Sequence, residues 1–164
     1  MRRNLYRITV ICSLFAIAAI ASAQTRKPGL WDLTTIMTWQ QSPFPTGANG
    51  APAAVPHTVQ VCLTQQQIDK YGAILPQTRG CQIANLVNNP TSMTADMVCT
   101  GHLNGKATLH ATWTDSEHAT GGMHFIGSMQ VGADSKPIEW TTASTSVYKG
   151  SDCGSVKPNP MPDK

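Results

Sequence analysis

The chain has little charge, few aromatic side chains and none of several familiar catalytic motifs. Charged residues make up 13% and aromatic residues 6% of its 164 residues. It contains no Cys-x-x-Cys pair, no Gly-x-Ser-x-Gly elbow and no His-Glu-x-x-His sequence. Its glycine-containing turns precede strand-like segments rather than helices, which argues against a phosphate-binding loop. The sequence therefore offers no local motif for a thiol oxidoreductase, a serine hydrolase or a zinc peptidase.

A stretch of membrane-spanning length is also missing. The longest apolar run, residues 8–21, has about 14 residues, whereas a spanning helix needs about 20. Three arginines precede this run, and the small residues Ala21-Ser22-Ala23 follow it. This order is typical of a secretory signal peptide, so we predict that residues 1–23 are removed and that the mature protein is periplasmic or secreted. Cys12 would leave with the signal, because Ile11 stands where a lipoprotein signal has a small residue.

Removal of the signal peptide would leave the protein without net charge. Three of the twelve basic residues lie in it, and the remaining nine match the nine acidic residues. The basic residues that remain do not cluster, so nucleic acid is not expected as a partner, and neither is stable membrane insertion. Representative members of this scattered set are Arg26, Lys27, Lys70, Arg79, Lys106, Lys136 and Lys149. The roughly 140 remaining residues suit one domain.

Four cysteines remain in the predicted mature chain, and an oxidising compartment favours two disulfides. The segment around Pro90 is a strong turn signal with alternating apolar residues on both sides. Folding the chain there places Cys81 directly opposite Cys99, so we predict this disulfide. Cys62 with Cys153 follows by elimination, and Cys62 with Cys81 remains the alternative.

The rest of the sequence has the two-residue periodicity of strands. Residues 30–39 alternate between apolar and polar side chains, residues 40–56 form an exposed loop rich in proline and glycine, and residues 58–63 form a second strand. Thr64 can cap a short helix, and Gln67 completes a capping box.

Turns divide the second half of the chain into further strands. We expect a hairpin turn at Asn104-Gly105 with a bulge at Gly101, a turn at residues 115–119, and a turn at residues 133–136. The Thr/Ser run at residues 141–146 is interpreted as a solvated strand face or edge.

These elements predict a mainly β fold in residues 24–153. About seven strands would form an antiparallel meander that curls into a barrel or half-barrel, with the helix over an open end. Residues 154–164 hold three prolines without apolar periodicity and are predicted to be a disordered tail.

The sequence resembles a known family at several points. KPGLWDLTT near the start, VCLTQQQ, the spaced Cys81 and Cys99 and the closing GSDCG resemble the exported bacterial family called domain of unknown function 3617. The resemblance covers residues 27–154 and implies export, a single domain and disulfides, but no activity. Gly29-x-Trp31 is also similar to the opening of lipocalins and related calycin barrels.

Inward-facing apolar side chains could fill a solid core or line a ligand cavity. The candidates for such a lining are Trp31, Leu33, Met37, Leu109, Met123, Phe125 and Trp140. His110 and His124 are expected opposite each other on the outward face of adjacent strands and form a candidate metal pair, although the pattern supplies no third ligand. No cofactor is implied.

Three functions fit these observations. The first is a non-enzymatic module that binds a small apolar ligand or an envelope partner. The second is a metal-dependent or hydrolytic enzyme around His110 and His124. The third is a structural protein that uses a sheet edge to bind a partner.

Overall fold

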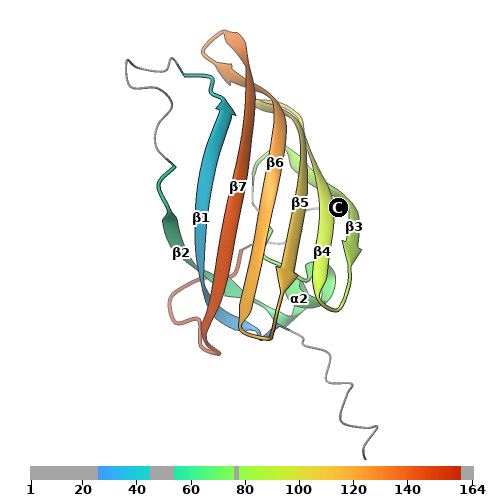
Figure 1. The fold of residues 1–164 in the computed structure, drawn as a ribbon, viewed down its shortest axis with the longest axis vertical. Coiled ribbons are helices and arrows are strands. Elements are labelled where there is room, and N and C mark those ends of the chain that lie inside the picture. The colour runs from blue at the N-terminus through green and yellow to red at the C-terminus, as the bar shows by residue number, and fades with distance from the viewer. Residues whose placement is uncertain (1–25, 45–53, 76–77, 160–164) are drawn as a thin grey trace, which may run out of the picture.

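One curved sheet makes up most of the protein (Figure 1). The structure, a computed structural model, describes residues 26–44, 54–75 and 78–159. Seven strands lie in the order β2-β1-β7-β6-β5-β4-β3, and all neighbours are antiparallel. The strands are β1 (Gly29–Gln41), β2 (His57–Leu63), β3 (Cys81–Asn88), β4 (Ser92–Cys99), β5 (Leu103–Trp113), β6 (His118–Val131) and β7 (Asp134–Gly150), and the helix is α2 (Gln65–Tyr71).

The sheet curls without closing. Strands β3 to β7 follow one another as a meander, and β7 then pairs with β1, so the first and last strands are neighbours. Within the described residues β2 and β3 form the two edges. Helix α2 follows β2 and lies at the end of the sheet where β1 begins (Figure 1). The predicted mainly β fold of seven antiparallel strands in a half-barrel is therefore confirmed.

The predicted limits of the first segments agree well with the structure. Strand β1 ends at Gln41 and β2 begins at His57, and the described residues between them form no strand. The remainder of that loop, residues 45–53, and the predicted signal peptide, residues 1–23, lie outside the described residues. In the parts of the chain that the structure covers, no helix is long and apolar enough to cross a bilayer.

Alternating side chains place the core on the concave face of the sheet. In the larger of two buried clusters, Phe125 stacks on Trp140 with ring centroids 4.2 Å apart. The smaller cluster joins Trp31 and Leu63 to Ile68 of α2. The inward positions of the strands were therefore predictable from periodicity.

Two hairpin turns differ from their predicted positions. Asn104-Gly105 lies inside β5, and the turn before it occupies residues 100–102, where Gly101 has a φ of 117°. The last hairpin turns at Gly132-Ala133 and not at residues 133–136, because Gly132 adopts a φ of 64° and Val131 pairs with Asp134. The apolar face is preserved in both cases, since a strand shifted by an even number of residues keeps its inward set.

A bulge changes the end of β3. The register shifts between Ala84 and Val87, and Asn85 has a positive φ of 49°. Unbroken alternation from Cys81 would turn the Val87 side chain inward, but it is 52% exposed, while Leu86 packs against the core. Asn85 tolerates this backbone conformation better than most residues, and its Nδ2 donates a 2.6 Å hydrogen bond to Asp96.

Both predicted disulfides are present. Cys81 pairs with Cys99 across β3 and β4, where the two residues are direct neighbours in the register. Cys62 of β2 pairs with Cys153, just after β7. Disulfides fit an oxidising compartment outside the cytoplasm.

The helix start is also as predicted. Thr64 is the N-cap residue, and its hydroxyl accepts a hydrogen bond from the backbone N–H of Gln67. The Gln67 side chain in turn accepts one from the backbone N–H of Thr64 at 2.9 Å, which completes the capping box. The helix ends at Gly72, whose φ of 68° few other residues adopt easily.

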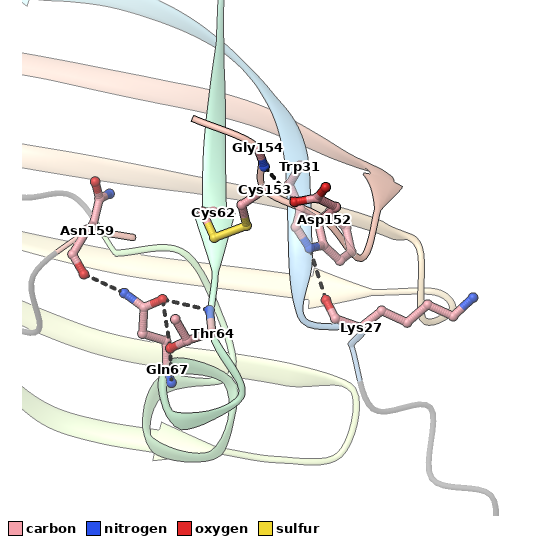
Figure 2. The surroundings of a disulfide bond; sticks show 9 residues. All are labelled: Lys27, Trp31, Cys62, Thr64, Gln67, Asp152, Cys153, Gly154 and Asn159. Atoms are coloured by element: carbon pink, nitrogen blue, oxygen red, sulfur yellow. Dashed lines mark hydrogen bonds between the residues drawn. A yellow bond between two sulfur atoms is a disulfide. The ribbon is translucent and has the colours of Figure 1, made fainter. Parts of the chain in front are cut away.

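The segment after Cys153 differs from the predicted disordered tail. Residues 154–159 run beside β2, and Pro158 forms a parallel bridge with Cys62. The carbonyl of Asn159 accepts a 2.8 Å hydrogen bond from Nε2 of Gln67 (Figure 2). The disulfide explains the difference, because it holds Cys153 against the edge strand and so brings the following residues next to it. Residues 160–164 lie outside the described part of the chain.

Candidate functional site

The concave side of the sheet borders a cavity of about 300 Å³. Its walls come from β1, β2 and β4 to β7, and from residues 73–75, which follow α2. The β1 and β2 side of the wall is apolar and contains Leu33, Val59 and Val61. Ile74 and Leu75 of the segment after the helix contribute further apolar surface.

Small side chains create this space. Ala111, Ala119, Gly121 and Ser144 occupy wall positions on the three adjacent strands β5, β6 and β7. A Cβ added at Gly121 would come within 2.9 Å of the His110 carbonyl oxygen and within 3.3 Å of Ser144 Oγ. Protein interiors are normally close-packed, so a set of short side chains on neighbouring strands leaves a void unless another element fills it.

The seven residues expected to line a ligand cavity divide into two groups. Leu33, Leu109 and Met123 do lie in the cavity wall. The structure places the other four elsewhere: Trp31, Phe125 and Trp140 are buried in the core, and Met37 is 40% exposed. The large aromatic side chains therefore fill the core, and the smaller side chains border the cavity.

The Thr/Ser run of β7 has a different role from the one expected. Residues 141–146 lie on a strand that is paired on both sides, so this run is not an edge. Its inward members Thr142, Ser144 and Ser146 line the cavity, and Ser146 is buried. Small polar residues at inward positions, where large apolar residues are the norm, were the sequence signal for a cavity.

Among the described residues of the cavity wall, Arg26 carries the permanent charge, and no sequence motif distinguishes it. It is 3% exposed, and its guanidinium lies over the Trp31 ring, with Cζ 4.4 Å from the ring centroid. Its Nη1 donates a 3.2 Å hydrogen bond to the carbonyl of Gly72. Among the described residues, its Nε and Nη2 have no hydrogen-bond partner.

Burial changes the acidity of this guanidinium. Removal from water disfavours the charged form and lowers the pKa of Arg26 from its usual range to about 10. Arg26 is still a cation at neutral pH. The cavity is therefore mostly apolar with one positive charge in its wall.

The segment after Cys153 also reaches the cavity. Asn159 lines it, and the hydrogen bond from Gln67 fixes the backbone of Asn159 against the helix. Figure 2 shows how the Cys62–Cys153 disulfide, the capping box and Asn159 lie close together at one end of the sheet. One wall of the cavity thus depends on a disulfide rather than on sheet hydrogen bonds.

Of the two candidate metal-binding histidines, His110 lies in the cavity wall and His124 does not, and the two do not face each other as expected. His110 pairs with Gly122, and His124 pairs with Thr108, because the β5–β6 register is shifted by two residues from the predicted one. Nε2 of His124 instead lies 2.8 Å from a carboxylate oxygen of Glu139. In the described parts of the chain, no three His, Cys, Asp or Glu residues gather closely enough to hold a metal ion.

Comparison with known proteins gives a family and no activity. The model of the family described as "Protein of unknown function (DUF3617)" matches residues 26–153. No curated protein matches the chain, and no solved structure does. The similarity of Gly29-x-Trp31 to lipocalins thus has no support from these comparisons.

Proposed function

The chain belongs to the DUF3617 family, and because that description names no activity, we propose from the cavity that the protein is a non-enzymatic module that binds a small apolar ligand. The observation that carries this proposal is the space of about 300 Å³ on the concave face, with a mainly apolar wall. Ligand sites typically measure about 300 to 1,000 Å³ and combine apolar walls with a few polar groups.

The arrangement of the core supports this proposal. Phe125, Trp140 and their neighbours fill one part of the concave face densely, so the sheet is able to pack without leaving a void. The part next to residues 73–75 is bordered by small side chains instead. A void costs free energy in an empty protein, and a ligand that fills it regains the lost contacts.

We also propose that the protein acts outside the cytoplasm, after export and removal of residues 1–23. The two disulfides support this location, since such bonds persist in oxidising compartments. The mass and N-terminal sequence of the protein recovered from the cell envelope test it, and an N-terminus at Gln24 is expected.

Binding of the small neutral fluorescent probe 1-naphthylamine tests the ligand-binding proposal. The wild-type protein is expected to bind one probe molecule, with a saturable rise in fluorescence. Ala111→Leu should abolish this rise, because the larger side chain extends into the cavity from β5. The variant should unfold at the same or a higher urea concentration, since it fills a void and removes no contact.

Thr108→Leu is the matched control for this experiment. Thr108 lies on the same strand, but its side chain is exposed. This variant adds the same apolar side chain and should bind the probe like the wild type. Equal probe binding by the Ala111 variant would show that the probe binds elsewhere, and the proposal would then be wrong.

A further inference from the structure

The buried arginine is not explained by a purely apolar ligand. Arg26 lines the cavity and is 3% exposed. No aspartate or glutamate lies in the described cavity wall, and Arg26 takes part in none of the ion pairs found among the described residues. A buried charge without a counterion is strongly unfavourable, and such charges are normally paired.

The contacts that Arg26 does make hold the guanidinium in place. The Trp31 ring lies against one face of its plane, and the Gly72 carbonyl accepts from Nη1. Nε and Nη2, which have no partner among the described residues, are adjacent on the guanidinium. Their N–H groups point in the same direction and match the two oxygens of a carboxylate, which can accept from both at once. Each of the two atoms exposes less than 1 Å² in the ligand-free protein, so binding requires a small shift of the Arg26 side chain toward the cavity.

We infer that the cavity binds an amphiphile with a carboxylate head, which accepts hydrogen bonds from Nε and Nη2 of Arg26, and a short apolar tail, which lies along Leu33, Val61 and Leu109. This inference rests on the proposed function, because it names the chemical class of the ligand in that cavity. The class includes the medium-chain fatty acids.

The dimensions of the cavity limit the length of the tail. At the roughly 30 Å³ that one water molecule occupies in the liquid, a cavity of about 300 Å³ holds about ten non-hydrogen atoms. Octanoate has this size. The apolar walls favour octanoate because its tail contacts them. A small hydrophilic anion, such as acetate or phosphate, would leave most of the cavity without contacts.

The acidity of Arg26 is consistent with an anionic ligand. Burial lowers the pKa of Arg26 to about 10, and the guanidinium remains charged at neutral pH. A bound carboxylate would favour the charged form and raise this pKa again. The ligand and the arginine therefore stabilise each other's ionised state.

Calorimetric titration of the full-length mature protein at neutral pH, with octanoate, 1-octanol and octylammonium, tests the inference. Octanoate is expected to bind one to one and more tightly than 1-octanol, and octylammonium should not bind. Arg26→Met should weaken octanoate binding about 10- to 100-fold, the range for loss of a hydrogen bond to a charged group. The same variant should leave the affinity for 1-octanol unchanged.

Two further variants separate charge from geometry. Arg26→Lys keeps the charge but loses the two parallel donors, so its octanoate affinity should lie between those of the wild type and Arg26→Met. Lys106→Met removes an exposed cation from β5 and should bind octanoate like the wild type. Equal octanoate affinities for the wild type and Arg26→Met, or equal affinities of the wild type for octanoate and 1-octanol, would overturn the inference.

The outcomes distinguish this inference from the proposed function. If neither 1-naphthylamine nor any of the three octyl compounds binds the wild type, the ligand-binding module itself is wrong. If the neutral compounds bind and Arg26→Met has no effect on octanoate, only the carboxylate inference is wrong.

Discussion

At the scale of single residues, the burial of the Arg26 charge lowers the stability of the ligand-free fold. Its pKa is lower in the folded protein than in the unfolded chain, so the fold disfavours its protonation. The penalty is fully present below about pH 10 and is relieved as the pH rises from there toward the higher pKa of the unfolded chain. Partial compensation comes from the Trp31 ring and the Gly72 carbonyl.

Arg26→Met should therefore stabilise the ligand-free protein. The lowering of this pKa to about 10 corresponds to about 3 kcal/mol at 1.36 kcal/mol per unit, and the lost contacts reduce the expected gain to about 1 to 2 kcal/mol. Urea unfolding of both proteins at about pH 7 measures it. An unfolding free energy lower than that of the wild type would show that the arginine's contacts outweigh its burial.

Asp115 differs from Arg26 in that its charged form stabilises the fold. One of its carboxylate oxygens accepts from the backbone N–H of Glu117 at 2.7 Å and from that of His118 at 2.8 Å. The hydrogen bond from Glu117, followed by that from the His118 side chain, lowers the pKa of Asp115 below 3.8. The ionised carboxylate thus stabilises the turn between β5 and β6 above this pH, and the contribution is lost as the pH falls further.

Asp115→Asn should consequently destabilise the protein only where the wild-type carboxylate is ionised. Its unfolding free energy should lie below that of the wild type at about pH 6, and the difference should shrink toward about pH 2. Urea unfolding at a series of pH values gives the comparison. A difference that stays constant over this range would mean that the charge of Asp115 contributes nothing to the turn.

At the scale of elements, the sequence predicts those features of the helix and strands that depend on residues close together in the chain. The capping box of Thr64 and Gln67 and the pairing of Cys81 with Cys99 each depend on residues that are close in sequence. The predicted turn at Asn104-Gly105 is wrong because residues 100–102 form a competing turn, which pairs Cys99 with Gly105. Two turn signals so close together cannot be ranked by local preference alone.

The two disulfides differ in how much chain they enclose. Cys81 and Cys99 are 18 residues apart, and Cys62 and Cys153 are 91 apart. In the chain-entropy model, the short loop is worth about 3 kcal/mol and the long one about 4.5 kcal/mol.

The serine double variants compare these two disulfides. The Cys62→Ser, Cys153→Ser protein should lose more unfolding free energy than the Cys81→Ser, Cys99→Ser protein, by about 1.5 kcal/mol. Urea unfolding of the two variants beside the oxidised wild type measures both losses. A larger loss for the Cys81 and Cys99 pair would show that local contacts at the β3–β4 hairpin matter more than loop length.

At the scale of the whole molecule, the sequence predicts the sheet but not the cavity. Alternation identifies inward positions such as Leu33 and Leu109, yet it cannot say whether the opposite side is filled. Arg26 lies outside the strands, and its burial depends on Gly72 and Trp31, which the fold brings to it. The segment that ends at Asn159 was missed for the same reason, since it has no apolar pattern and is positioned by a disulfide.

The pairing of β1 with β7 has a consequence for how the protein reaches its native state. Residue 30 finds its partner at residue 150, so β1 cannot join the rest of the sheet until nearly the whole chain is present. Contacts this distant in sequence are slow to form, because a long loop must close before they stabilise anything. In a nascent chain threaded through a channel from its N-terminus, β1 would wait for β7 until the end of the passage, and this pairing and the Cys62–Cys153 bond would follow together on the far side.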